Sequence, residues 1–174
     1  MCGITGLWDL GGTIAPEALT REVAAMTAAL SHRGPDSGAV WVDAEAGLGL
    51  GHRRLAIVDL SPTGAQPMAS ADGRFVISYN GEVYSHEDIR PSLAARGVAI
   101  RGHSDTEVML ESIAAFGIAA TLPRLIGMFA MAVWDRRERT AGARRRDRST
   151  PEGHGGAAGR GQARRRQARR RQAR

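Results

Sequence analysis

The division of this chain near residue 135 limits most strongly what it can fold into. Residues 1–135 carry nine arginines against fifteen Asp and Glu, a net charge of −6, and nearly all the large apolar side chains. Residues 136–174 carry fifteen arginines against three acids, a net charge of +12, and end in Gln-Ala-Arg-Arg-Arg repeats. A segment with so few apolar side chains cannot offset its ordering entropy by burial. The sequence therefore predicts a folded domain over 2–135 and a disordered Arg/Gly-rich tail over 136–174.

Within 2–135 the apolar spacing changes between the periods of strands and helices. Ser104 and Glu107 have the S-x-x-E spacing of a capping box, and Asn80-Gly81 is a break within a strand-like run. Several predicted strands follow one another without a helix between them, which favours the α+β class over a parallel doubly wound sheet. The pattern predicts strands over 3–10, 39–42, 48–58, 75–84 and 128–134, and helices over 16–30, 85–96 and 104–116.

Three further observations bear on where the chain works. It has no apolar run of about 18 residues, so no membrane span is expected. The N-terminus lacks the basic flank and apolar centre of a signal peptide. One cysteine cannot form an internal disulfide, which is typical of a reducing cytosol. We therefore expect a soluble cytoplasmic chain.

That single cysteine, Cys2, follows the initiator methionine. Removal of Met1 would leave a thiol and a free α-amine on one residue. In model compounds an α-amine titrates at about 7.7–8.0 and a thiol near about 8.5, so the amine can accept the proton of the thiol. Nucleophile and base would then arrive together.

Each candidate residue also has an ordinary structural interpretation. A cysteine at position 2 is more often an incidental thiol, and Asn80-Gly81 is normally a hairpin turn. Arg54 would be a solvated or ion-paired side chain, and Asp105 a first-turn residue favoured by the helix dipole. The two candidate histidines, His32 and His52, would be structural hydrogen-bonding groups.

The combination of motifs favours function. Seven separated motifs occur in order, at residues 1–4, 32–36, 51–61, 66–68, 79–84, 104–107 and 127–130. Over about residues 2–135 this series resembles the glutaminase domain of glutamine-hydrolysing asparagine synthetases, class II glutamine amidotransferases with an N-terminal nucleophile. The run His-Arg-Arg-Leu-Ala-Ile-Val-Asp-Leu-Ser at 52–61 points to the asparagine synthetase branch. The resemblance implies a four-layer α/β/β/α sandwich of the N-terminal-nucleophile hydrolase type, incomplete at its C-terminal strands.

The resemblance also implies roles for particular residues. Cys2 would attack the side-chain amide carbon of glutamine, with its own α-amine as base. The oxyanion would be held by the Asn80 side chain and the Gly81 N–H, after which ammonia leaves and water hydrolyses the thioester to glutamate. No metal or cofactor is implied for this half-reaction. Residues implied to bind glutamine are Arg54 at the α-carboxylate, Glu82 and Asp105 at the α-ammonium, Asn80 and Gly81, and the backbone of Leu55, Ala56, Ile57 and Val58.

The resemblance does not extend past Asp135. The chain has no Ser-Gly-Gly-x-Asp loop for ATP, so ATP and Mg are implied only for a synthetase domain outside this sequence. The implied partners are glutamine and either a separate synthetase chain or a second copy of this one. We expect the tail to arise from a frameshift or premature gene end, the alternative being a basic tail that binds nucleic acid. The alternatives for the whole chain are an inactive truncated remnant and a basic-tailed nucleic-acid-binding protein.

Overall fold

A computed structural model describes residues 2–55 and 64–148, which form two antiparallel sheets with helices against them. The α+β class is therefore confirmed. No helix in these two ranges is long and apolar enough to cross a membrane. In chain order the elements are β1 (Gly3–Trp8), α1 (Pro16–Ala29), β2 (Ser37–Asp43), β3 (Leu48–Arg54), β4 (Met68–Ala69), β5 (Phe75–Val83), α2 (His86–Ala94), α3 (Asp105–Phe116), α4 (Ile118–Thr121), the 3₁₀ helix η2 (Leu122–Arg124), β6 (Gly127–Asp135) and β7 (Thr140–Arg148).

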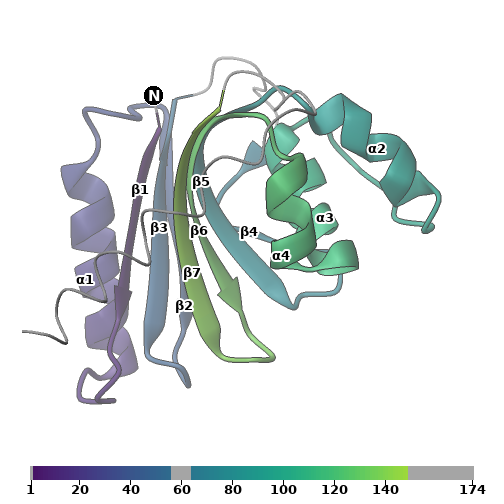
Figure 1. Cartoon of the computed structure of the whole chain (residues 1–174). Coiled ribbons are helices and arrows are strands. Elements are labelled where there is room, and N and C mark those ends of the chain that lie inside the picture. The colour runs from purple at the N-terminus through teal and green to yellow at the C-terminus, as the bar shows by residue number, and fades with distance from the viewer. Residues whose placement is uncertain (1, 56–63, 149–174) are drawn as a thin grey trace, which may run out of the picture.

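The two sheets pack face to face. The first has the strand order β1-β3-β2, and the second has the order β4-β5-β6-β7. Figure 1 shows α1 against the outer face of the first sheet, and α3 and α4 against the far face of the second. Pro16 stands at the first position of α1, where its missing N–H costs nothing, and Leu19 and Val23 are buried against the sheet.

Strand β5 lies at the centre of this arrangement and is buried on both faces from Phe75 to Tyr79. One face carries Ile77 and Tyr79, which pack in the core cluster with α2 and α3. The other face carries Val76, which packs between the sheets with Leu50 and Trp134. Because side chains alternate along a strand, each residue of β5 can be assigned to one of these two faces.

The predicted break at Asn80-Gly81 is wrong, because β5 runs through it. Gly81 pairs with Phe129 and Val83 pairs with Gly127 in unbroken register with β6. A type I′ hairpin turn needs the left-handed conformation at both central residues. Gly81 instead has φ of +151° and stays within the ladder.

The two serines that precede predicted helices, Ser104 and Ser85, make different hydrogen bonds. Ser104 caps α3 as predicted, because its side chain accepts a hydrogen bond from the Glu107 N–H at 3.1 Å. Ser85 precedes α2 but makes no capping bond within it. Its hydroxyl instead donates to the carbonyl of Arg124 and accepts from the N–H of Ile126, both at 2.9 Å. Ser85 thus joins the start of α2 to the segment that leads into β6.

Strand β7 corrects the predicted boundary at Asp135. Residues 140–148, which we assigned to the disordered tail, pair with β6 from Asp135↔Thr140 to Gly127↔Arg148. The expectation that the strand after β6 is missing is also wrong. The prediction failed because main-chain pairing with β6 needs no buried apolar side chain on β7, so neither the loss of apolar pattern nor the basic composition after Asp135 marks the end of the sheet. The remainder of the predicted tail, 149–174, lies outside the described residues.

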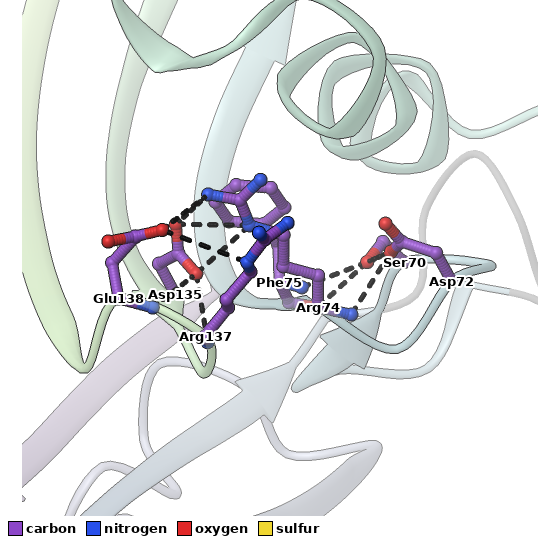
Figure 2. Close-up of polar contacts among 7 residues, drawn as sticks. All are labelled: Ser70, Asp72, Arg74, Phe75, Asp135, Arg137 and Glu138. Carbon is purple, nitrogen blue, oxygen red and sulfur yellow. Dashed lines mark hydrogen bonds and ion pairs between the residues drawn. The ribbon is translucent and has the colours of Figure 1, made fainter.

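A network of polar contacts closes the end of the second sheet at which β5 begins and β6 ends (Figure 2). The Arg74 guanidinium donates to the Asp135 carboxylate, with Nη2 at 2.7 Å from Oδ2. The N–H groups of Arg137 and Glu138 donate to Asp135 Oδ1 at 3.0 and 3.1 Å. Burial opposes ionisation of Asp135, but these donors together hold its pKa below the usual value. The carboxylate therefore fixes the turn between β6 and β7.

Candidate functional site

Cys2 lies where β1 begins, beside the residue that follows β3. Gly3 pairs with Arg53, so Cys2 and Leu55 lie at the same end of the first sheet. The half-buried Cys2 Sγ accepts a hydrogen bond from the Leu55 N–H at 3.4 Å. The Cys2 carbonyl accepts from Arg33 Nε at 3.3 Å. The thiol is thus held at a sheet end, partly open to solvent.

The loop motif at 32–36 packs directly on the end of β3. Arg53 donates from Nε to the Gly34 carbonyl at 2.7 Å and from Nη2 to the Pro35 carbonyl at 3.2 Å. The Asp36 N–H donates to the Arg54 carbonyl at 3.2 Å. A Cβ on Gly34 would lie 2.5 Å from the Arg53 carbonyl oxygen, so only glycine allows this approach. Sequence reasoning missed Arg53 as the anchor, although its signal was the doubled arginine in the motif.

Strand β5 runs beside β3 toward the same end. Ser78 Oγ donates to the Gly51 carbonyl at 3.0 Å, and His52 Nε2 lies 3.0 Å from the Tyr79 carbonyl oxygen. The two strands therefore run in the same direction toward this end, because packed sheets keep their strands nearly aligned. Asn80 has the same parity as Ser78, which assigns its side chain to the face that looks toward the first sheet. The structure thus brings Asn80 to the end of the sandwich that holds Cys2.

Among residues 2–55 and 64–148, no strand pairs with this edge of β5 beyond β4, and we call that stretch the open edge of β5. Strand β4 pairs only Met68 with Ile77 and Ala69 with Val76. Past that point the Tyr79 N–H donates to Gln66 Oε1 at 2.6 Å, and the Val83 N–H donates to Asp105 Oδ2 at 2.9 Å.

Main-chain N–H groups alternate in direction along a strand. The Gly81 N–H therefore lies on this same open edge, between the N–H groups of Tyr79 and Val83. A Cβ on Gly81 would overlap the Met128 carbonyl oxygen and lie 2.5 Å from the Phe129 Cα. The edge thus presents a backbone donor at a residue where only glycine fits.

Asp105 is the first residue of α3, and its carboxylate contacts this edge of β5. Its Oδ2 accepts hydrogen bonds from the Tyr79 hydroxyl at 2.6 Å and from the Val83 N–H at 2.9 Å. Burial, with the Asp105 charge beside it, raises the pKa of Tyr79 above its usual value. The Tyr79 hydroxyl therefore stays protonated and donates to Asp105 at neutral pH.

Arg54 and Glu82 are the remaining predicted residues that the structure describes. Arg54 ends β3 and is half-buried, and Glu82 follows Gly81 in β5 and is exposed. Gln66 and Tyr79, to which sequence reasoning gave no catalytic or binding role, lie within the site. No group of three His, Cys, Asp or Glu side chains is arranged to hold a metal ion in the part of the chain that the structure describes. The predicted contacts at Ala56, Ile57 and Val58 lie outside the described residues.

His52 is buried beneath the site, with 1% of its surface exposed. Burial lowers its pKa to about 4, helped by the Arg54 charge and opposed by the hydrogen bond to Tyr79. The imidazole is therefore neutral at pH 7. Since its Nε2 faces a carbonyl oxygen, Nε2 carries the proton and donates.

This depressed pKa predicts a loss of stability in mild acid. The unfolded chain protonates His52 near its ordinary value of 6.5, whereas the folded protein does so only near 4. As pH falls from 6.5 to 4 the unfolded state therefore binds more protons, and the free energy of unfolding should drop by about 2 kcal/mol at pH 5. Urea unfolding at pH 7.5 and 5.0 measures this drop. In His52→Gln, which cannot titrate, we expect most of it to vanish; an equal drop in both proteins would contradict the assignment.

Comparisons with known proteins show the family of the domain. A family model described as "Glutamine amidotransferase domain" matches residues 1–151. Asparagine synthetase [glutamine-hydrolyzing] 3 of Bacillus subtilis (strain 168) is 44% identical over 137 residues, which cover 78% of this chain and 21% of that protein. Asparagine synthetase [glutamine-hydrolyzing] 1 of the same organism is 35% identical over 141 residues, covering 79% and 21%. The chain thus spans about a fifth of the length of these curated relatives.

A solved structure supports the fold. Glutamine phosphoribosylpyrophosphate amidotransferase from B. subtilis, complexed with ADP and GMP, superimposes with a TM-score of 0.57 at 18% sequence identity. The match covers 78% of this chain and 35% of that one. At this identity the likeness concerns the fold alone.

Proposed function

The chain belongs to the glutamine amidotransferase family, and we propose that it hydrolyses glutamine to glutamate and ammonia in the manner of the asparagine synthetases. The proposal is supported by strand register, which directs three groups toward one end of the sandwich. These groups are the Cys2 thiol, the Asn80 side chain and the Gly81 N–H on the open edge of β5. A nucleophile next to two preorganised donors is the arrangement that acyl transfer needs.

The proposed reaction begins after removal of Met1. The α-amine of Cys2 accepts the thiol proton, and Sγ forms a bond to the side-chain amide carbon of glutamine. Asn80 and Gly81 donate hydrogen bonds to the oxyanion that develops on the carbonyl oxygen, each donor contributing about 3 kcal/mol. The carbon–nitrogen bond then breaks, and the proton held by the α-amine leaves with ammonia. Water hydrolyses the resulting thioester, which releases glutamate and restores the thiol.

The same end of the sandwich supplies charges for the α-amino acid group of glutamine. The planar guanidinium of Arg54 suits a carboxylate, which it can bind through two parallel hydrogen bonds. We assign the α-ammonium to Asp105 and Glu82. Within the described residues both bonds to Asp105 use Oδ2, so Oδ1 is the oxygen that we assign to the ammonium. Leu55 and the predicted segment 56–58 would add backbone contacts.

We further propose that the layers form the α/β/β/α sandwich of N-terminal-nucleophile hydrolases. We also propose that the chain works in the cytoplasm. The ammonia would serve an ATP-dependent amidation of aspartate by a synthetase domain, on a separate chain or within a homodimer. The relatives are named asparagine synthetases, which supports aspartate as the acceptor of the ammonia. ATP and Mg belong to that domain, and no step of the glutaminase reaction involves them.

The direct test is ammonia release from glutamine by the full chain, with asparagine as the control substrate. Intact-mass analysis first establishes that Met1 is absent, and a urea transition establishes that the protein is folded. Glutamine-dependent ammonia release above the level of Cys2→Ala is the expected result. A folded protein without Met1 that releases no ammonia would be a non-catalytic remnant, and the proposal would fail.

The two acidic residues should differ in what their loss does. Glu82→Gln removes the charge of Glu82 and should raise KM for glutamine about tenfold, because a charge-assisted hydrogen bond contributes about that much to binding. The free energy of unfolding should change by less than about 0.5 kcal/mol, because the Glu82 side chain is exposed. Asp105→Ala should raise KM and also cost about 2 kcal/mol of stability, because the Tyr79 hydroxyl and Val83 N–H lose their acceptor. Steady-state kinetics and urea unfolding measure both. An unchanged KM in both variants would show that neither Glu82 nor Asp105 binds the α-ammonium.

A further inference from the structure

Three side chains from different parts of the chain converge on Tyr79. His52 of β3 donates to its carbonyl oxygen at 3.0 Å, and Gln66 accepts from its N–H at 2.6 Å. Asp105 of α3 accepts from its hydroxyl at 2.6 Å. Tyr79 itself is 3% exposed. We call His52 and Gln66 the Tyr79 clamp, because they hold its two main-chain groups.

The clamp acts on the peptide planes that lead into Asn80. The Tyr79 N–H belongs to the plane between residues 78 and 79, and its carbonyl belongs to the plane between residues 79 and 80. Each peptide unit is rigid, so a bond to one of its polar atoms orients the whole unit. At this edge a neighbouring strand would ordinarily make these bonds, but the pairing with β4 stops at Ile77.

We propose that His52 and Gln66 are positioning residues that orient the Asn80 side chain and the Gly81 N–H toward the Cys2 thiol. This inference rests on the proposed glutaminase function. The two side chains touch neither the thiol nor, in the proposed reaction, the glutamine. Their effect is exerted through the backbone of Tyr79, which directly precedes Asn80 and lies two residues before Gly81. Displacement of such donors by about 1 Å can cost about 100-fold in rate.

A purely structural role would look different, and Ser78 supplies the matched control. Ser78 is fully buried, and its hydroxyl donates to the Gly51 carbonyl at 3.0 Å. That bond joins the same two strands one residue before the clamp, but it holds neither main-chain group of Tyr79. Ser78→Ala therefore removes a comparable hydrogen bond between the sheets without releasing the clamp.

The kinetic test compares four variants of the full chain, His52→Leu, His52→Gln, Gln66→Met and Ser78→Ala. We expect kcat for glutamine hydrolysis to fall about 10- to 100-fold in His52→Leu and Gln66→Met, with KM within about threefold of the starting protein. His52→Gln keeps an N–H donor and should recover most of kcat. Ser78→Ala should lose stability but keep kcat within about twofold. Equal kcat in Ser78→Ala and in the two clamp-breaking variants would overturn the proposal.

A second measurement does not depend on activity. Backbone ¹⁵N relaxation should give an order parameter near about 0.85 for Gly81 in the starting protein and in Ser78→Ala, and about 0.6 or less in His52→Leu and Gln66→Met. If the starting protein releases no ammonia but Gly81 behaves in this way, the proposed function fails and the clamp stands. An unchanged Gly81 order parameter in both clamp-breaking variants overturns the clamp, whatever the activity.

Discussion

Replacement of Cys2 by alanine is expected to lower kcat for ammonia release from glutamine by about 10⁴-fold or more. The thiol is the nucleophile in the proposed reaction, and removal of a nucleophile leaves only binding and oxyanion stabilisation. The free energy of unfolding should change by less than about 1 kcal/mol. Cys2 is half-buried, and its Sγ hydrogen bonds with described residues are weak sulfur bonds to the main chain of Leu55. A coupled ammonia assay and urea unfolding measure the two quantities.

The control for this prediction separates the thiol from the α-amine. A protein that carries an uncleaved extension before Cys2 keeps the thiol in place but converts the α-amine into an amide. We expect this protein to be nearly as inactive as Cys2→Ala, because the base has been removed. Full activity in the extended protein would refute the α-amine as base, and full activity in Cys2→Ala would refute the nucleophile.

The second large effect is expected at Gly81, where alanine should cost about 3–5 kcal/mol of stability. The added Cβ would overlap the Met128 carbonyl oxygen and approach the Cα of Phe129 to 2.5 Å. The backbone also has φ of +151°, a conformation that side chains with a Cβ rarely adopt. Steric overlap and backbone strain therefore add. Urea or thermal unfolding measures the loss, and residual activity should disappear because the oxyanion donor moves.

Two other glycines separate the two causes. Gly97 has φ of +74°, but no atom lies within 4 Å of the position that a Cβ would take, so Gly97→Ala reports backbone strain alone, about 1 kcal/mol. Gly142 also has open space and is not among the positive-φ residues, so Gly142→Ala should be close to neutral. A Gly81→Ala protein no less stable than Gly97→Ala would show that β5 and β6 separate easily at the site.

Elements that bury an apolar face were predictable from the sequence. The spacing of Leu19 and Val23 predicted α1, and the alternation from Phe75 onward predicted β5, because burial imposes those periods. Strand β7 left no such trace. Its residues hold their place by main-chain pairing with β6, which any side chain permits. The hairpin-like dipeptide Asn80-Gly81 misled for the opposite reason, since local turn preference was overridden by pairing with β6.

Motif resemblance names a set of candidate residues but not their arrangement. Motif resemblance pointed to Cys2, Asn80 and Asp105, and the structure brings Cys2 and Asn80 to one end of the sandwich. The contacts of Arg53, His52 and Gln66 could not be foreseen, because each side chain bonds to a main-chain atom 13 to 27 residues away. A main-chain partner leaves no residue type in the sequence to mark it.

The shortness of β4 has a consequence for how such a site could be switched off. If β4 continued opposite Gly81, one of its carbonyls would take the Gly81 N–H as an ordinary ladder bond, and another would displace Gln66 from the Tyr79 N–H. The sheet would be more complete, and the donor proposed for the oxyanion would already be occupied. One N–H cannot serve both purposes, so strand pairing and catalysis compete for it. Any extended segment that paired along this edge of β5 would occupy the donor proposed for the oxyanion, without touching the thiol.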